Sequence, residues 1–319
     1  MNYRKLGSTG IEVSEIGLGC NNFGMRIDLE DTRAVVTKAL DLGINLFDTA
    51  DKYGNFGGSE TLLGQVLGEN RKRIVLATKF AAPMAADVTR KNASRRYIMS
   101  AVEASLTRLK TDWIDLYQLH YYDELTPMEE TLRALDDLVR QGKVRYIGCS
   151  NLAAWQMVDA LWISTHLNLN RFVSAQGEYS VIVREIEREI LPAIQANGIG
   201  LLPYFPLASG LLSGKYTRNA PPPPGTRLAE IRRFGDRYST GINWDAVEYV
   251  QAFCAKRGRT MLELALNWLL SKPVVSSVIA GATKPEQVEQ NVKAAGWKLT
   301  EEELAEVNAF PKGYATPLS

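Results

Sequence analysis

Residues 44–54 read INLFDTADKYG: an apolar run, a carboxylate at Asp48 and, five residues later, a phenol at Tyr53. The run has the length and content of a buried strand, so Asp48 stands at the carboxyl end of that strand and Tyr53 in the loop that follows. An aspartate in this position often caps the next helix, and a Tyr-Gly pair often lies in a loop. Whether the stretch is structural or functional therefore depends on what stands at the ends of the other strands.

Seven further short apolar runs alternate along the chain with amphipathic segments of helical period. With 45–47, the predicted strands are 15–18, 74–77, 114–117, 146–148, 173–175, 200–202 and 275–279. The helical patterns between them include 32–42, 59–67, 95–109, 128–140, 152–161 and 185–196. Gly43, Gly142 and Gly198 follow three of these helices, where a residue in the left-handed region is favoured. Eight strand–helix units favour an α/β fold, a (β/α)8 TIM barrel, over an open doubly wound sheet.

Three additions to the barrel are expected. Residues 3–13 predict an N-terminal β-hairpin around a turn at 7–10. The stretch after the seventh strand runs for about 70 residues, far more than one crossover needs. It holds the surface loop 221–225 and helical patterns at 244–256 and 261–270. A capping box, Thr300 with Glu303, predicts an extra C-terminal helix, and residues 1–319 are interpreted as a single barrel domain.

The composition excludes several classes of protein. Of the 319 residues 45% are hydrophobic and 23% charged, as in a globular protein with a large core. The 37 basic and 36 acidic residues leave a net charge of +1, which does not indicate nucleic acid or an anionic membrane surface as a partner. The first ten residues lack the apolar core of a signal peptide, and no run approaches the ~18 apolar residues that span a bilayer. We therefore expect a cytoplasmic protein, and its oligomeric state is left open.

Cysteine and histidine are too sparse for a disulfide framework or a zinc site. The cysteines are Cys20, Cys149 and Cys254, without CxxC spacing, and the histidines are His120 and His166. We expect no metal, because a metal site here would need a cluster of carboxylates that the sequence does not show.

Polar residues end three consecutive strands. Asp48 ends the second, Lys79 the third and His120 the fourth, and Tyr53 lies in the loop after the second. A lone lysine in such a place is usually solvated and a lone histidine usually structural. In a β/α barrel, however, the carboxyl ends of the strands face one common site. The four residues together therefore predict an active site.

The motifs that contain these residues, together with two later ones, resemble those of a known family. They are FDTADKYG (47–54), ATKF (77–80), LYQLH (116–120), GCSN (148–151) and GATKPEQVEQN (281–291). Over essentially its whole length the chain is similar to the aldo-keto reductases. Within them it most resembles a bacterial branch that is also similar to voltage-gated potassium channel β subunits.

The resemblance implies a catalytic tetrad of Asp48, Tyr53, Lys79 and His120 and the NADPH-dependent reduction of an aldehyde or ketone. Reduction delivers a hydride to carbon and a proton to oxygen, and a free phenol with a pKa of about 10 is a weak acid at neutral pH. We expect Lys79 to lower the pKa of Tyr53, and Asp48 to keep Lys79 charged. His120 would orient the substrate oxygen and, with Tyr53, stabilise negative charge on it.

No GxGxxG motif opens a βαβ unit, so a Rossmann site is not indicated. The resemblance implies instead a nicotinamide cofactor extended across the barrel. Ser150, Asn151 and Gln176 would bind its carboxamide, and Tyr204 would stack on the nicotinamide ring. Residues 207–210 with Lys215 would hold the pyrophosphate, and 281–291 the adenosine end. The full expected set is Gly19, Cys20, Asp48, Ser150, Asn151, Gln176, Tyr204, Phe205, Leu207, Ser209, Gly210, Lys215, Gly281, Thr283, Lys284, Gln287, Gln290 and Asn291.

The adenosine segment departs from the best-known branch of the family. Members of that branch often carry a Lys-Ser pair early in the segment and an arginine later, where this chain has Gly281-Ala282 and Gln287. Lys284 is the one cation inside the segment, and we expect it to favour NADPH. Charge from the long insertion is a further source, at Lys215, Arg218 and Arg227, and use of NADH is possible on this pattern.

The substrate pocket is expected to suit a small polar carbonyl compound. The expected substrate contacts are Asn21, Phe23, Tyr53, Phe80, His120 and Tyr121, with Asn22, Lys52, Phe56 and Phe205 as further wall candidates. Two other functions fit the same sequence: a regulatory cofactor-binding protein like the channel β subunits, and a barrel lyase or isomerase without nicotinamide. Cys20 is either a redox-sensitive thiol near the site or a small packing residue.

Overall fold

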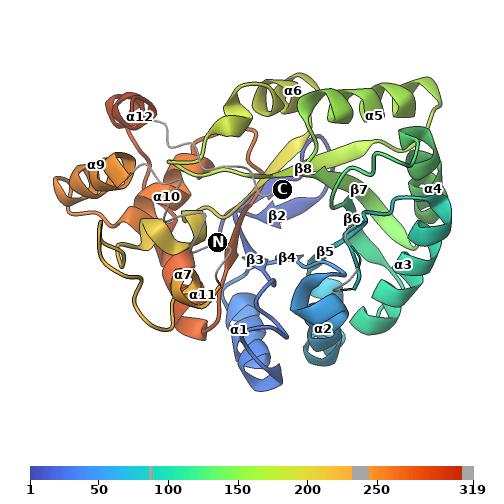
Figure 1. Ribbon diagram of the computed structural model, residues 1–319, viewed down its shortest axis with the longest axis horizontal. Coiled ribbons are helices and arrows are strands. Elements are labelled where there is room, and N and C mark those ends of the chain that lie inside the picture. Colours follow the sequence, from blue (N-terminus) through green and yellow to red (C-terminus); the bar gives the residue numbers. More distant parts are fainter. Residues whose placement is uncertain (86–87, 89, 232–243, 311–319) are drawn as a thin grey trace.

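Eight parallel strands form a barrel at the centre of the molecule (Figure 1). The computed structural model describes residues 1–85, 88, 90–231 and 244–310. The strands pair in chain order, and the last pairs with the first of the eight. They are β3 (Ile16–Gly19), β4 (Leu46–Asp48), β5 (Val75–Phe80), β6 (Ile114–Leu119), β7 (Val144–Ser150), β8 (Phe172–Glu178), β9 (Gly200–Tyr204) and β10 (Val278–Gly281). Two backbone hydrogen bonds join β9 to the chain just before β10: Leu201 N donates to Val274 O, and Leu201 O accepts from Ser276 N.

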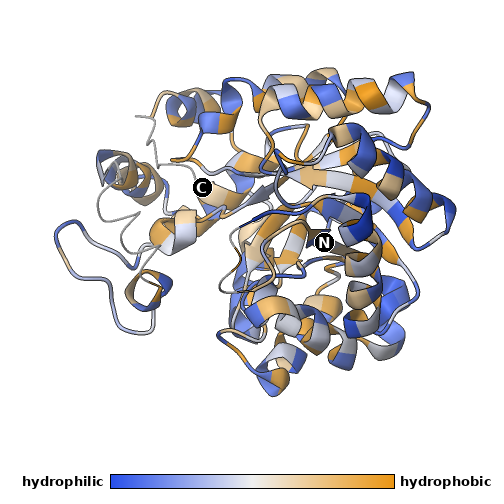
Figure 2. Cartoon of the chain, turned by 45° about the vertical axis from the view of Figure 1, so that its right-hand side comes forward, coloured by the Kyte–Doolittle hydropathy of each residue, from blue (hydrophilic) through white to orange (hydrophobic). Residues whose placement is uncertain are grey.

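Amphipathic helices cover the outside of the barrel (Figure 1). They are α1 (Leu29–Asp41), α2 (Tyr53–Val66), α3 (Arg95–Leu109), α4 (Met128–Arg140), α5 (Ala154–His166), α6 (Ile190–Ala196) and α11 (Pro285–Ala294). In α4, for example, Leu132, Leu135 and Leu138 are buried while Arg133 is exposed. This spacing of three and four residues gives each helix one apolar face, and hydrophobic and hydrophilic residues accordingly lie side by side along the outer helices in Figure 2.

Most of the remaining elements lie in the connections between these strands and helices and after α11. The insertion between β9 and β10 holds η3 (Ala208–Ser213), α7 (Arg227–Glu230), α9 (Trp244–Ala255) and α10 (Met261–Leu270). Short helices η1 (Gly68–Arg73) and η2 (Glu185–Glu187) lie in connections, and α12 (Glu301–Asn308) follows α11. No helix among the described residues is both long enough and apolar enough to cross a bilayer.

A hairpin of β1 (Tyr3–Lys5) and β2 (Glu12–Ser14) packs against the amino ends of the barrel strands. Leu6 and Val13 are fully buried, in one cluster with the innermost apolar side chains of the barrel. The turn requires glycine at Gly7, where φ is +57° and a Cβ would lie 2.5 Å from Val173 O. The hairpin therefore fills one end of the barrel with apolar side chains.

The alternation of side chains along the strands explains why the other end is polar. Leu46 and Ala77 belong to the apolar cluster inside the barrel. Two residues further along the same strands come Asp48 and Lys79, which therefore face the same interior one layer nearer the carboxyl ends. An apolar floor thus lies directly beneath the polar layer.

The fold confirms the barrel, the hairpin and the capped helix after Thr300, and Gly43, Gly142 and Gly198 all have positive φ. Several expected boundaries differ from those observed, two of them for a clear physical reason. The last strand begins at Val278, because residue 275 makes only an isolated bridge. The helix expected at 185–196 is split into η2 and α6, because Pro192 tolerates a helix only when it lies in the first turn.

Candidate active site

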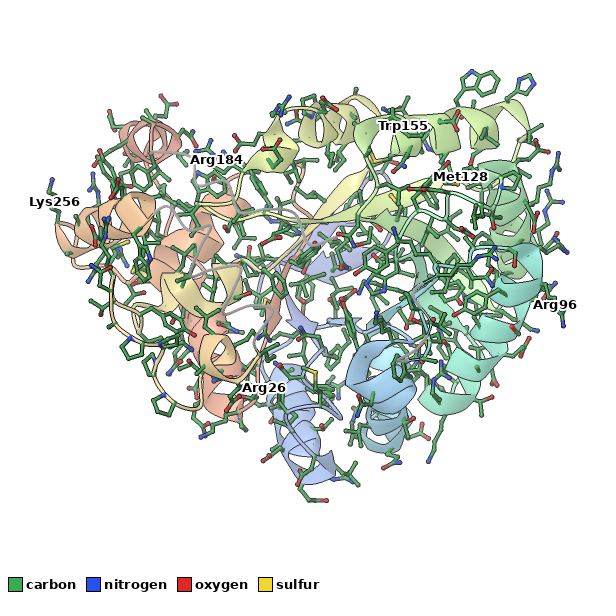
Figure 3. The ribbon with its side chains drawn as sticks, in the orientation of Figure 1. Arg26, Arg96, Met128, Trp155, Arg184 and Lys256 are labelled. Atoms are coloured by element: carbon green, nitrogen blue, oxygen red, sulfur yellow. The ribbon has the colours of Figure 1, made fainter. Side chains whose placement is uncertain are left out.

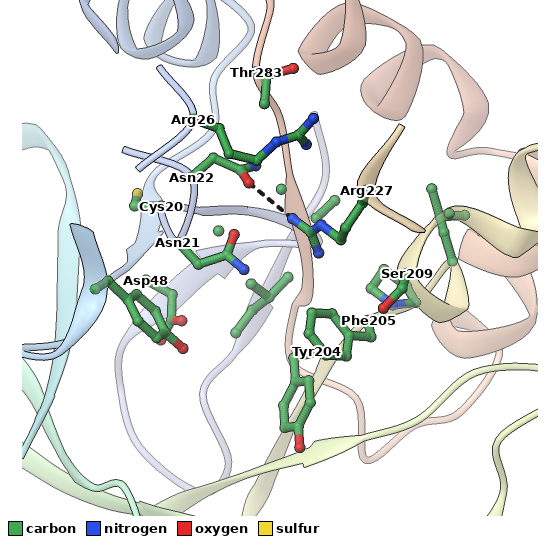
Figure 4. A pocket seen from close by; sticks show the side chains of 18 of the residues that line it. Cys20, Asn21, Asn22, Arg26, Asp48, Tyr204, Phe205, Ser209, Arg227 and Thr283 are labelled. Carbon is green, nitrogen blue, oxygen red and sulfur yellow. Dashed lines mark hydrogen bonds between the residues drawn. The ribbon is translucent and has the colours of Figure 1, made fainter. Parts of the chain in front are cut away.

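A cavity of about 970 Å³ opens at the carboxyl ends of the strands. Its described walls include residues that end six of the eight strands or immediately follow them: Gly19, Asp48, His120, Ser150, Tyr204 and Gly281. Figure 4 shows side chains from the early loops and from the insertion pointing into it from opposite sides. The cavity therefore lies at the end of the barrel where the sequence pattern placed the site.

Asp48 and Lys79 form a buried ion pair at the floor of the cavity. Lys79 Nζ lies 2.6 Å from Asp48 Oδ2 and also donates a hydrogen bond to the carbonyl oxygen of Thr49 at 2.9 Å. The other carboxylate oxygen accepts from the amides of Gln118 at 3.2 Å and Gln176 at 2.9 Å. Three donors thus bind the Asp48 carboxylate in a place where an unpaired charge would be costly.

Tyr53 and His120 stand above this ion pair. Their rings meet edge to face with centroids 5.8 Å apart, and Lys79 Nζ lies 5.1 Å from the centre of the Tyr53 ring. His120 is buried, and burial, with the charges of Lys79 and Lys52, holds its pKa well below the usual range. The imidazole is therefore neutral at neutral pH, and its Nδ1 has no hydrogen-bond partner among the described residues.

The pKa of Tyr53 moves in the direction opposite to our expectation. Burial raises it well above the usual value of a phenol, and the negative charge of Asp48 raises it further. Lys79 does not reverse this, because its ammonium is paired with Asp48 at 2.6 Å and the two charges act on the phenol with opposite sign. In the free site Tyr53 is therefore a firmly protonated phenol.

Most of the residues expected to bind the cofactor line the cavity. Tyr204 is among them, and its hydroxyl donates a hydrogen bond to Asn151 Oδ1 at 2.8 Å. The expected residues that line the cavity are Gly19, Cys20, Asp48, Ser150, Asn151, Gln176, Tyr204, Phe205, Leu207, Ser209, Gly210, Lys215, Gly281, Thr283, Gln287, Gln290 and Asn291. Lys284 is exposed and is not part of the wall.

The substrate side agrees less well with the sequence. Asn21, Asn22, Lys52, Tyr53, His120, Tyr121 and Phe205 line the cavity. Phe23 and Phe80 do not; both are fully buried in the hydrophobic core, where Phe80 stacks on Tyr117 with centroids 4.7 Å apart. Phe56 is exposed outside the wall.

The insertion supplies a loop that fits a phosphate-bearing cofactor. Ala208, Ser209 and Gly210 all have positive φ, which is unusual for the first two and marks a tightly fixed turn. The hydroxyl of Ser209 is buried, and it has no hydrogen-bond partner among the described residues. An orphaned donor beside Lys215 and Arg227, both on the same wall, is the chemistry that a pyrophosphate requires.

Several residues that sequence reasoning missed take part in the site, among them Gln118 and Arg26. Gln118 binds Asp48, and its position two residues before His120 could have revealed that it faces the interior. Arg26 lines the cavity and pairs with Glu230 at 2.7 Å, across 204 positions of sequence. No local signal marks this contact. Close by, Arg227 donates to Asn22 Oδ1 at 3.0 Å, the dashed line in Figure 4.

Cys20 behaves as a packing residue. Its side chain is fully buried, and burial, followed by the charge of Asp48, raises the pKa of the thiol well above its usual value. A thiol that is neither exposed nor ionised is a poor redox sensor.

The match to a family model covers nearly the whole barrel. Residues 15–312 match the aldo/keto reductase family. The chain belongs to this family. The nicotinamide cofactors that the family generally uses are consistent with the phosphate-compatible loop and the cationic wall described above.

Three relatives in this family illustrate its range. An uncharacterized oxidoreductase of Bacillus subtilis is 36% identical over 99% of this chain and 98% of its own length. A probable voltage-gated potassium channel subunit beta of Arabidopsis thaliana is 35% identical over 92% of this chain and 91% of its own. L-glyceraldehyde 3-phosphate reductase of Escherichia coli is 32% identical over 97% of this chain and 92% of its own. The family and these names support an oxidoreductase that acts on small molecules.

Proposed function

We propose that this protein reduces aldehydes or ketones with NADPH, a reaction that is reversible toward alcohol oxidation. The observation that carries the proposal is the arrangement at the cavity floor: a protonated phenol and a neutral imidazole side by side above a buried Lys–Asp ion pair. The oxidoreductase relatives support the same reading. One of them is named as an L-glyceraldehyde 3-phosphate reductase, and this name describes the reduction of a small aldehyde.

Each polar group has a part in the proposed reaction. When bound, NADPH supplies the hydride that adds to the carbonyl carbon, and it leaves as NADP⁺. As the carbonyl π bond breaks, Tyr53 donates its hydroxyl proton to the oxygen, and the product is the alcohol. His120, being neutral, donates an N–H hydrogen bond to the same oxygen and fixes its position. Lys79, 5.1 Å from the ring, stabilises the phenolate that remains on Tyr53.

The cofactor would lie along the wall formed by β9, the insertion and the start of α11. Ser209, Lys215 and Arg227 would hold its phosphates, Tyr204 would pack against the nicotinamide, and Gln287 and Asn291 would contact the adenosine end. The preference for NADPH rests on Arg26, Lys215 and Arg227 in the cavity wall, in addition to the exposed Lys284.

A second function is favoured by the relatives named as potassium channel β subunits. On this alternative the protein binds NADPH but serves as a regulatory subunit, with little turnover. The test is the rate of NADPH oxidation with a panel of aldehydes and ketones. Sustained turnover that is lost in Tyr53→Phe supports the reductase. NADPH binding without turnover by any carbonyl favours the regulatory protein, and no change of NADPH fluorescence on mixing favours a barrel enzyme that does not use nicotinamide.

A further inference from the structure

Among the described residues five cationic side chains line the cavity, and they form two groups. Arg26, Lys215 and Arg227 make up one, since burial and the charges of the two arginines together lower the pKa of Lys215. Lys52 and Lys91 make up the other. They lie in the loops after β4 and β5, on the part of the wall that also carries Tyr53, His120 and Tyr121. The first group accounts for the phosphates of a dinucleotide, whereas the second has no role in the reaction described so far.

Both lysines of the second group stand close to the reacting groups. Lys52 directly precedes Tyr53, and its charge reaches His120 strongly enough to lower the pKa of the imidazole. The ammonium of Lys91 lies 5.6 Å from the ring centre of Tyr121. That ring in turn stacks on His120, with the two planes 12° apart and centroids separated by 4.5 Å. Lys91 is therefore one aromatic ring away from the imidazole.

Nothing in the described part of the wall neutralises these two charges. Asp48 is the one carboxylate among the described lining residues, and it is already paired with Lys79. Within the described part of the chain neither Lys52 nor Lys91 forms an ion pair. Two ammonium groups of one sign in a concave site attract anions and raise their local concentration.

We propose, on the basis of the proposed reductase function, that the natural substrate is a small carbonyl compound carrying a phosphate or carboxylate group. Lys52 and Lys91 bind the anionic group while the carbonyl oxygen contacts Tyr53 and His120. A short substrate satisfies both ends at once, because Lys52 adjoins Tyr53 in sequence and Lys91 adjoins His120 through a single ring. Orientation by a remote charge also holds the carbonyl in one pose.

The test compares matched pairs of substrates that differ in charge. Glyceraldehyde 3-phosphate is paired with glyceraldehyde, and succinic semialdehyde with its methyl ester. The measured quantity is the ratio of kcat/KM for the charged member to kcat/KM for the neutral one. The wild type is expected to prefer the charged member of at least one pair, and which pair shows the preference identifies phosphate or carboxylate. Lys52→Met and Lys91→Met should each lower that ratio about tenfold, since each removes a charge-assisted hydrogen bond.

The controls separate charge from shape. Lys91→Arg keeps the charge and should keep most of the ratio. Lys256→Gln removes an exposed lysine that lies beyond α9, away from the cavity (Figure 3), and should leave the ratio unchanged. A wild-type ratio at or below one for both pairs overturns the proposal, and so does a preference that survives in the Lys52→Met/Lys91→Met double variant.

If the proposed reductase function is wrong, the experiment gives a different result. In that case no carbonyl compound is reduced, and the binding of inorganic phosphate and of succinate to NADP⁺-saturated protein is measured by calorimetry. Saturating NADP⁺ occupies the other cationic group, so the anion reports on Lys52 and Lys91. Binding that the double variant loses supports the anion site even though the reaction is wrong. Equal binding in both proteins overturns the site as well.

Discussion

Lys79 Nζ lies 2.6 Å from Asp48 Oδ2, with 0% of the lysine side chain and 4% of the aspartate side chain exposed. The lysine comes from the third strand of the barrel and the aspartate from the second. Asp48 lines the cavity, and the ammonium of Lys79 lies 5.1 Å from the centre of the Tyr53 ring. The pair has further hydrogen-bond partners, since the amides of Gln118 and Gln176 donate to Asp48 and the carbonyl of Thr49 accepts from Lys79. Stability and chemistry thus depend on the same two side chains.

The first prediction concerns the stability of this pair. Lys79→Met leaves the Asp48 carboxylate buried without its counter-ion, and removing one partner of a buried pair typically costs about 3–5 kcal/mol. Asp48→Asn/Lys79→Met removes the stranded charge and should be more stable than Lys79→Met alone. Urea unfolding of both variants measures the difference. If Lys79→Met loses less than about 1 kcal/mol, the pair is not buried in solution.

The second prediction concerns the proton donor. Tyr53→Phe keeps the ring and removes the hydroxyl, and general acid catalysis is typically worth ~10²–10⁴-fold. We expect kcat to fall by at least about 100-fold, with the dissociation constant of NADPH nearly unchanged. Lys79→Met should lower kcat to a similar extent, and the double variant little further, because the two groups act as a unit. Turnover in Tyr53→Phe close to that of the wild type would assign the proton to another group.

The third prediction concerns a buried carboxyl behind the site. Asp51 is 1% exposed, and its Oδ1 has no hydrogen-bond partner among the described residues. Burial, and then the charge of Glu60, raise its pKa from 3.8 to about 8. Below about pH 4 the carboxyl is protonated whether the chain is folded or not. Between there and about pH 8 only the unfolded chain ionises, so this group's contribution to the free energy of unfolding falls as the pH rises.

Asp51→Asn removes this titration. The contribution of Asp51 falls by at most about 1.4 kcal/mol per pH unit, and the variant should therefore gain stability relative to wild type as the pH rises from about 5 to about 8. Urea unfolding across that range gives the difference between the two proteins at each pH. A difference that is constant with pH would mean that Asp51 is ionised in the folded chain at neutral pH.

Strand periodicity and position along the chain together predicted which polar residues face the barrel interior. Asp48, Lys79 and His120 stand at or just beyond strand ends, and the alternation along β4 and β5 directs the first two into the barrel. The same alternation explains why Phe80, expected to contact the substrate, does not line the cavity. It adjoins Lys79 on β5, so its side chain points away from the barrel interior and packs on Tyr117. Choosing it by its aromatic character overlooked that geometry.

Contacts between distant loops could not be predicted in this way. Arg26 meets Glu230, and Arg227 meets Asn22, only because the insertion returns across the loop after β3. Neither loop has a periodic pattern that fixes its path. Sequence reasoning therefore expected the cation that favours NADPH at Lys284, in the recognisable segment before α11. Of the further sources named from the sequence, Lys215 and Arg227 line the cavity, and the structure adds Arg26, whereas Lys284 is exposed outside the cavity wall.

The last prediction decides between these positions for cofactor preference. Arg227 lines the cavity wall near Lys215, and a hydrogen bond to a charged group is worth roughly 1.5–3 kcal/mol. Arg227→Gln should therefore weaken NADPH binding by ~10–100-fold, and Lys284→Ala by less. The dissociation constants of NADPH and NADH are measured by fluorescence for both variants and the wild type at one salt concentration, because charge contacts weaken with salt.

A loss of affinity confined to NADPH means that the side chain binds the 2′-phosphate. An equal loss for both cofactors means that it binds the pyrophosphate that they share. If Lys284→Ala loses more NADPH affinity than Arg227→Gln, the segment before α11 carries the preference after all, and Lys284 reaches the cofactor from outside the cavity wall.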